Sequence, residues 1–166
     1  MKREIPKKNY VIVVIMAIVV IALVFYLAKL YTNATLNQNS SVISNYLSNV
    51  TLEEMDNYLL ENPDIIVYWA DREDLTNEKF EKQLKKYIVK NNLQKYFVFV
   101  DIKDIDVKKI ESISNKYLSK KIKNVTLETK PSLLIIEDSK IVEVVYTYEQ
   151  DMKYLREKFQ SYGVSE

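Results

Sequence analysis

Three carboxylates and one guanidinium occupy four consecutive positions, Asp71, Arg72, Glu73 and Asp74, just after an apolar run that contains Trp69. Clustered carboxylates can bind Ca²⁺ or Mg²⁺ through oxygen ligands, or act as general acids and bases. Carboxylates at the start of a helix also accept hydrogen bonds from free N–H groups, each worth about 0.3–1 kcal/mol. Since Arg72 partly neutralises the cluster, we expect capping here rather than a metal site or catalysis.

The residue types that the chain lacks exclude several kinds of chemistry. Without cysteine it has no disulfide, thiolate nucleophile or thiolate metal ligand, and without histidine it lacks the commonest general base and zinc ligand. A single glycine is too few for a phosphate-binding loop, and a net charge of +1 gives no electrostatic case for nucleic acid. We therefore expect no catalytic residue, no cofactor, no metal and no nucleic-acid partner, and an enzyme is the less favoured interpretation.

The N-terminal part predicts a membrane anchor. Val11 to Ala28 contains no charged residue, and with Asn9 and Tyr10 it reaches the roughly 20 residues that span a bilayer. The basic residues of positions 1–8 outnumber the single acidic one, and the positive-inside rule places such a segment in the cytoplasm. We expect a cytoplasmic tail over 1–8, a transmembrane helix over 9–30 and an extracytoplasmic remainder.

A cleaved signal peptide is the alternative for this segment. The apolar core of a signal peptide usually has about 7–15 residues, and this run is longer. The length favours a retained anchor in the cell membrane, and whether the helix is ever cleaved stays open.

The rest of the chain predicts one α/β domain. Residues 31–41 are rich in asparagine, serine and threonine and read as a polar tether. The domain follows over 42–166 and alternates strand and helix patterns, which predicts a mixed sheet with helices on both faces. The expected strands are Val42–Leu47, Ile65–Trp69, Tyr96–Ile102, Leu133–Ile136 and Ile141–Tyr146, and the expected helices follow Thr51, cover Thr76–Lys90 and Val107–Leu118, and close the chain from Met152 to Tyr162.

Three local features resemble the thioredoxin family over residues 42–162. Tyr68-Trp69-Ala70 resembles the aromatic-Trp-Ala that ends the family's central strand, and Pro131 before Ser132-Leu133-Leu134 resembles its cis-proline. The turn at Asp138-Ser139 stands where the family has its strand-turn-strand. The resemblance implies a thioredoxin-like fold, with a cis Lys130–Pro131 bond close to the turn at 71–74.

The same resemblance places Glu73 and Thr76 at the positions of the two redox cysteines. Neither residue can form a mixed disulfide, so the family's thiol chemistry is not carried over. The resemblance therefore implies a redox-inactive domain.

We expect this domain to bind another protein or peptide as an accessory subunit. The expected docking surface consists of Trp69, Asp71, Arg72, Glu73, Asp74 and Pro131. For Trp69, packing in the core is the competing interpretation to a partly exposed aromatic beside Pro131. Two other functions stay open: a divergent member of a thiol-oxidoreductase lineage with a non-thiol activity, and a structural spacer in a membrane assembly.

Overall fold

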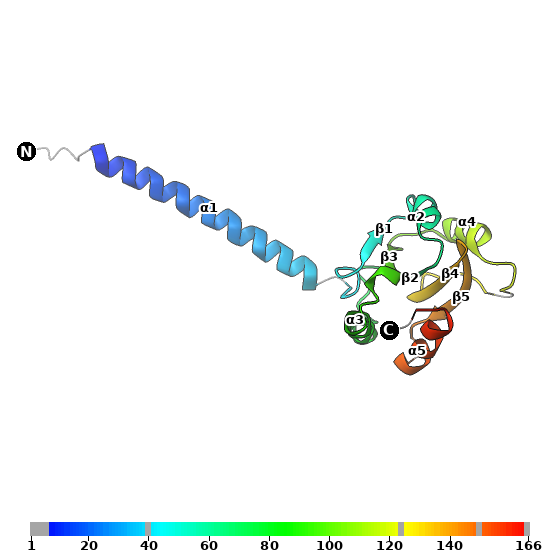
Figure 1. The fold of residues 1–166 in the computed structure, drawn as a ribbon. Helices are drawn as coiled ribbons and strands as arrows, with labels where there is room; N and C mark the ends of the chain where they lie inside the picture. Colours follow the sequence, from blue (N-terminus) through cyan, green and yellow to red (C-terminus); the bar gives the residue numbers. More distant parts are fainter. Residues whose placement is uncertain (1–6, 39–40, 123–124, 149–150, 165–166) are drawn as a thin grey trace, which may run out of the picture. The chain divides into compact units, whose positions relative to one another are not determined.

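The computed structural model describes residues 7–38, 41–122, 125–148 and 151–164, and the chain divides into two units, Met1–Gln38 and Asn39–Glu166. The first unit contains one helix, α1 (Lys7–Gln38). Its stretch Val11–Leu30 is long and apolar enough to cross a membrane, and its side chains are exposed. Residues 31–38, expected to begin the tether, continue this helix (Figure 1), while residues 39–40 lie outside the described part.

The second unit is a five-stranded mixed sheet with helices on both faces, as the alternating pattern predicts (Figure 1). Its strand order is β1-β3-β2-β4-β5; β1, β3 and β2 run parallel, while β4 is antiparallel to both β2 and β5. The elements are β1 (Ser48–Val50), α2 (Met55–Glu61), β2 (Ile65–Ala70), α3 (Glu78–Lys90), the short 3₁₀ turn Gln94–Tyr96, β3 (Phe97–Asp101), α4 (Val107–Tyr117), β4 (Ser132–Glu137), β5 (Lys140–Tyr146) and α5 (Met152–Ser161).

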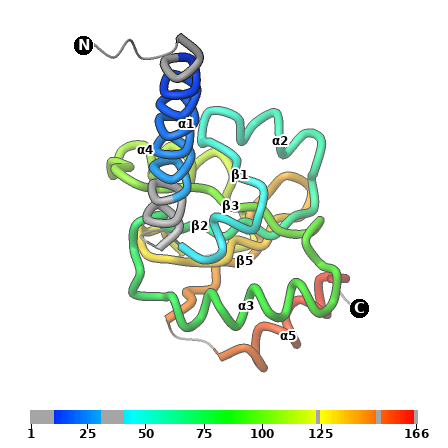
Figure 2. The backbone as a smooth tube through the Cα atoms, turned by 90° about the vertical axis from the view of Figure 1, so that its left-hand side faces the viewer, coloured from blue at the N-terminus to red at the C-terminus, as the bar shows by residue number. Residues whose placement is uncertain are grey.

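Two hydrophobic cores lie on opposite faces of the sheet, because successive side chains of a strand point to opposite sides. Along β2, Ile66 and Tyr68 pack into the core under α3 and α5, while Val67 and Trp69 pack into the core under α2 and α4. Figure 2 shows the strands between these two helix pairs. All six residues of β2 are buried, as expected of a central strand that is covered on both faces.

The predicted strand Val42–Leu47 is wrong, because these residues form turns and β1 begins only at Ser48. Local hydrogen bonds explain the difference. The Ser44 N–H donates to Ser41 Oγ (3.2 Å), the Ser44 hydroxyl donates to the Ser41 carbonyl (2.8 Å), and the Leu47 N–H donates to the Ile43 carbonyl (3.0 Å). Serine side chains that bond their own backbone in this way compete with strand pairing.

The local features predicted at two helix ends are present, although α2 itself begins at Met55, after a turn over residues 52–54. Thr51 and Glu54 form the capping box: the Thr51 N–H donates to Glu54 Oε2 (3.1 Å), and the Glu54 N–H donates to Thr51 Oγ1 (3.3 Å). Past the end of α5, Gly163 has a φ of +74°, a conformation that glycine adopts without strain.

The hairpin between β4 and β5 turns through Asp138 and Ser139, which have φ angles of 50° and 60°, the signs that a tight hairpin turn of the primed type needs. β5 is the last strand of the sheet, and the chain after α4 passes along its outer side. There Leu118 forms a parallel bridge with Ile141, and the Ser119 N–H donates to the Ile141 carbonyl (2.9 Å).

Candidate functional site at the carboxyl edge of the sheet

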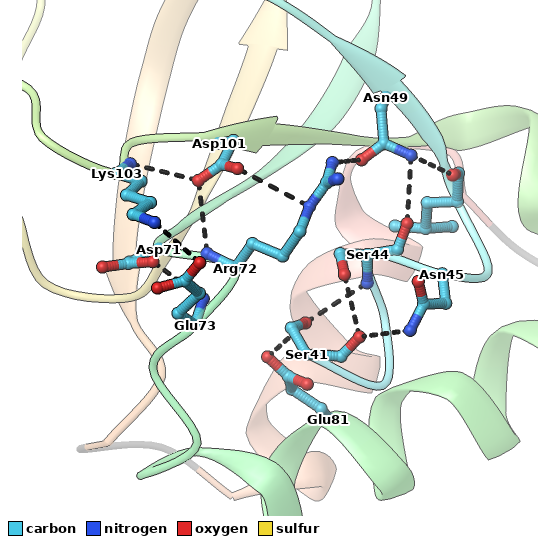
Figure 3. A network of polar contacts seen from close by, with 11 residues as sticks. Ser41, Ser44, Asn45, Asn49, Asp71, Arg72, Glu73, Glu81, Asp101 and Lys103 are labelled. Carbon is cyan, nitrogen blue, oxygen red and sulfur yellow. Dashed lines mark hydrogen bonds and ion pairs between the residues drawn. The ribbon is translucent and has the colours of Figure 1, made fainter. Parts of the chain in front are cut away.

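The loops expected to form the docking surface meet at one edge of the sheet, which we call the carboxyl edge: residues 71–77 after β2, 102–106 after β3, and Pro131 before β4. Parallel β2 and β3 both end here, with Ala70 beside Asp101. The antiparallel pairing of Trp69 with Ser132 puts Pro131 opposite the end of β2. Open α/β sheets bind ligands beyond the carboxyl ends of their strands. Figure 3 shows the polar network at this edge.

Trp69 belongs to the core and not to the surface. Its side chain has no exposed area, and its indole N–H donates to the Glu128 carbonyl at 2.9 Å. The expectation of a partly exposed aromatic at the docking surface is therefore wrong, and the core-packing interpretation holds. Trp69 is buried because its side chain lies on the same face of β2 as Val67, in the core under α2 and α4.

Asp71 and Asp74 cap the loop that precedes α3. Asp71 Oδ1 accepts from the Glu73 N–H (2.8 Å), and Asp74 Oδ1 accepts from the Thr76 N–H (2.9 Å). These are Asx turns, in which an aspartate side chain bonds the backbone two residues on. The capping interpretation holds for both residues, but the N–H groups belong to the loop rather than to α3.

The two positions that the resemblance assigns to redox cysteines, Glu73 and Thr76, both lie in this loop. The helix expected from Thr76 begins two residues later, at Glu78. Glu73 is exposed and its Oε1 lies 2.6 Å from Lys103 Nζ, and this hydrogen bond raises the pKa of Lys103 above its ordinary value. Glu73 therefore serves in an ion pair between the β2 and β3 loops.

Arg72 connects three segments at the carboxyl edge (Figure 3). Its guanidinium donates to Asn49 Oδ1 on β1 (2.6 Å) and lies 3.5 Å from Asp101 Oδ2 at the end of β3. The second distance is that of an ion pair without hydrogen-bond alignment, and the guanidinium also lies 5.7 Å above the Phe99 ring. Its own carbonyl accepts from the Ser41 N–H (2.7 Å). Arg72 therefore has a structural role: its guanidinium lies between Asn49 of β1 and Asp101 of β3 and contacts both.

Beneath this network lies a buried carboxylate that the sequence analysis did not single out. Glu81 on α3 is 1% exposed. Its oxygens accept from the Ser41 hydroxyl (2.8 Å), the Val42 N–H (2.7 Å) and the Tyr68 hydroxyl (3.1 Å). A weaker contact comes from the Ile43 N–H at 3.4 Å. These donors compensate for the loss of water, as a buried carboxylate requires.

Tyr68 is the donor to Glu81 that comes from the sheet, since it lies on the central strand β2. Burial raises the pKa of the Tyr68 hydroxyl above its ordinary value, and the negative charge of Glu81 raises it further. The phenol therefore stays protonated and donates its hydrogen bond throughout the physiological range.

The carbonyl of Pro131 is tied to the end of β5. The Thr147 N–H and hydroxyl both donate to it, at 3.2 and 3.1 Å, and Asn77 Nδ2 donates to Thr147 Oγ1 at 2.8 Å. The Lys130–Pro131 bond is trans, so the expected cis bond is wrong. The pairing of Trp69 with Ser132 brings Pro131 to the end of β2. That Pro131 lies close to the turn at 71–74 stays a prediction.

A hollow of about 350 Å³ opens between the ends of β1 and β3. Each charged group that lines it has a partner: Arg72 with Asp101, Lys103 with Glu73, and Lys109 with Glu53 at 2.6 Å. In the described part of the chain, no three acidic side chains are placed to hold a metal ion. These ion pairs raise the pKa of Lys103 and lower the pKa of Glu53, so both groups are held in their charged forms. Paired charges of this kind suit recognition through polar contacts better than proton transfer, which needs a pKa near the working pH.

The burial of Glu81 could have been predicted from its spacing in the sequence. Glu81 is three residues before Leu84 and seven before Ile88, so it belongs to the buried stripe of α3. A charged residue at such a position predicts a buried partner, although its partners 38–40 positions earlier cannot be read from the helix itself.

Comparison of the sequence with protein-family models and with curated proteins gives no match. The function is therefore argued from the geometry described above.

Proposed function

We propose that this chain is a membrane-anchored, redox-inactive protein with an extracytoplasmic thioredoxin-like domain that binds another protein as an accessory subunit. The observation that carries the proposal is the position of Pro131 opposite the end of β2, the strand that leads into the acidic loop at 71–74, in a chain without cysteine. That is where a thioredoxin-like domain would hold an extended segment, and holding one by backbone hydrogen bonds needs no thiol.

Two further observations support the thioredoxin-like part of the proposal. The domain has a mixed sheet in which β4 runs antiparallel to β2, in agreement with the mixed sheet that the resemblance implies. The helices α3 and α5 cover one face of the sheet, and α2 and α4 cover the other. The trans bond before Pro131 departs from the family pattern.

The docking surface that we propose is polar rather than aromatic. It consists of Asp71, Arg72, Glu73, Asp74 and Pro131, without Trp69. Glu73 is exposed, and the neighbouring hollow between β1 and β3 is lined by the ion pairs of Arg72 with Asp101 and of Lys109 with Glu53. Such a surface would recognise a partner by hydrogen bonds and charge more than by apolar burial.

Burial of Trp69 favours one alternative, a structural spacer, because an exposed aromatic would have anchored a partner more strongly. A photo-crosslinking amino acid at Glu73, in the full chain in membranes, separates the two functions. The matched position is Glu111, an exposed glutamate on α4. A docking surface predicts a discrete adduct from Glu73 that Glu111 does not give. Absence of an adduct at Glu73, or equal adducts at both positions, would favour the spacer.

The topology can be tested with the same chain, because it contains no cysteine of its own. We expect a membrane-impermeant maleimide to label Glu111→Cys in intact cells and to leave Lys8→Cys unlabelled until the membrane is permeabilised. Labelling of Lys8→Cys alone would reverse the proposed orientation.

A further inference from the structure

A second surface, independent of the carboxyl edge, lies between α3 and α5, which run side by side in both views of the fold (Figures 1 and 2). Two helical stripes face each other across a hollow of about 600 Å³, which we call the basic groove. Its lining residues are Gln83, Lys86, Tyr87, Lys90 and Asn91 from α3 and its end, and Met152, Arg156 and Gln160 from α5. The spacings of three and four residues put each set on one side of its helix.

The cations of the basic groove have no carboxylate partner among the residues that the structure describes. In the described part of the chain, the ion pairs of α3 and α5 are Lys82–Glu78 and Lys158–Glu143, and neither involves Lys86, Lys90 or Arg156. All three of these side chains are exposed. Arg156 lies over the ring of Tyr87, 5.4 Å from its centroid, so its guanidinium is already placed at the wall of the groove.

On the other face of the sheet, two lysines of α4 form ion pairs. There Lys109 of α4 pairs with Glu53, just before α2, and Lys116 of α4 pairs with Asp56 of α2. The domain as a whole is acidic: five of the 24 basic and one of the 23 acidic residues precede Asn39, which leaves 19 basic and 22 acidic. Among the described residues, the cations of the basic groove are therefore without ion pairs in a domain that carries more carboxylates than cations.

We propose that the basic groove binds an extended acidic segment of a partner protein. Lys86, Lys90 and Arg156 would meet its carboxylates, and charge complementarity of this kind steers association and fixes the register. The amides of Gln83, Asn91 and Gln160 both donate and accept, so they match the N–H and C=O groups of an extended peptide. Met152 and the Tyr87 ring give its intervening side chains an apolar contact.

The shape of the groove and its amides favour a peptide over an anionic lipid surface. A flat layer of lipid headgroups would contact the outer sides of α3 and α5 and would not enter the hollow between them. A phosphate needs donors only, so the carbonyl oxygens of the three amide side chains would gain nothing from it. Binding to lipid is therefore an outcome that the test must be able to reveal.

The test uses the full chain in zwitterionic detergent and a fluorescent peptide of alternating glutamate and alanine as the probe. The first variant replaces Lys86, Lys90 and Arg156 with glutamine. A matched control replaces three exposed cations elsewhere, Lys108, Lys120 and Lys121, with glutamine and so makes the same change in net charge. A charge-conserving variant, Lys86→Arg with Lys90→Arg and Arg156→Lys, tests the groove without neutralising it.

We expect the groove variant to bind the peptide at least about tenfold more weakly than the unaltered chain, since three exposed ion pairs are lost. The control and the charge-conserving variant should bind within about threefold of the unaltered chain. Affinity should fall as salt is added, because exposed charges are screened. Circular dichroism establishes that each variant is folded.

Three results would overturn the proposal. The first is no measurable binding of the peptide by the unaltered chain at low salt. The second is an equal loss of affinity in the groove variant and its control, which would assign the effect to net charge alone. The third is unchanged peptide binding together with weaker binding of phosphatidylglycerol vesicles by the groove variant, after reconstitution in phosphatidylcholine nanodiscs, which would assign the groove to lipid. Because the photo-crosslinking at Glu73 probes a different surface, either proposal can fail without the other.

Discussion

The carboxylate of Glu81 accepts a 2.7 Å hydrogen bond from the backbone N–H of Val42, 39 residues earlier in the chain. With Ser41 and Tyr68 as its other close donors, it fixes the first turns of the domain onto α3. A buried carboxylate with this many donors is costly to disturb, because these donors have no other acceptor among the described residues.

We expect Glu81→Ala to lower the free energy of unfolding by about 1–3 kcal/mol, since the Val42 N–H and the Ser41 and Tyr68 hydroxyls lose their acceptor. The matched control is Glu78→Ala, which removes an exposed carboxylate from the same helix and breaks only its pair with Lys82. That control should cost less than about 1 kcal/mol. Urea unfolding of the full chain in detergent, followed by Trp69 fluorescence, measures both. Equal effects would mean that Glu81 has no special role.

We expect Arg72→Lys to destabilise the chain by about 1–2 kcal/mol, because a compact ammonium cannot reach both Asn49 and Asp101 as the guanidinium does. Arg156→Lys is the control, since Arg156 has no ion pair with a described residue. It should change the free energy of unfolding by less than about 0.5 kcal/mol. A value for Arg72→Lys within that range would show that the contacts of Arg72 at the carboxyl edge add no stability.

A loss of stability at high pH should depend on Tyr162. Burial and its hydrogen bond to Glu143 raise the pKa of Tyr162 to about 12, against 10.0 for the free side chain. The folded state therefore holds this proton more tightly, so its contribution is fully present below pH 10 and is lost as pH rises towards 12. Tyr162→Phe should lose less stability than the unaltered chain across this window.

The measurement for Tyr162 is urea unfolding at a series of pH values. The unaltered chain is the comparison, because it shares every other titratable group with the variant, including Lys158, whose pKa is also raised by its hydrogen bond to Glu143. Identical slopes for the two chains would contradict the prediction.

A thioredoxin-like loop should accept a disulfide at the positions that the resemblance assigns to thiols. In Glu73→Cys/Thr76→Cys, we expect the pair to oxidise under mild conditions if the Cα atoms lie about 4.4–6.8 Å apart. The variant should stay folded and gain thiol–disulfide exchange activity. Single-cysteine variants at each position are the controls, and thiol counting with mass measurement gives the result. A folded double variant that keeps both thiols reduced would mean that the loop has been rebuilt.

The sequence predicted the elements that depend on nearby residues. The continuous apolar run of β2, the capping box at Thr51 and the turn at Asp138 and Ser139 are all local, and all three are present. The alternation of strands and helices was enough for a mixed sheet covered on both faces, because each apolar face must be buried against another element.

The failures depend on contacts between distant parts of the chain. Trp69 lies in a strand that is buried on both faces, and alternation does not say which face opens near the loop. Val42–Leu47 has residues typical of a strand, but its N–H groups bond elsewhere. The Val42 N–H donates to Glu81, and the Ser44 N–H donates to Ser41 Oγ. For the candidate site, the sequence found the carboxylates of the loop, while the partners of Arg72 come from β1 and β3 and could not be assigned.

The bridge between Leu118 and Ile141 covers the outer side of β5 at Ile141 with the protein's own chain. A seven-residue outer strand with free N–H and C=O groups is a template on which another polypeptide can add a strand. Here the Ser119 N–H already satisfies the Ile141 carbonyl, and the Tyr146 hydroxyl near the other end of the strand donates to the Thr126 carbonyl. A strand from another copy that paired with β5 along its whole length would therefore have to displace Leu118 and Ser119 from Ile141.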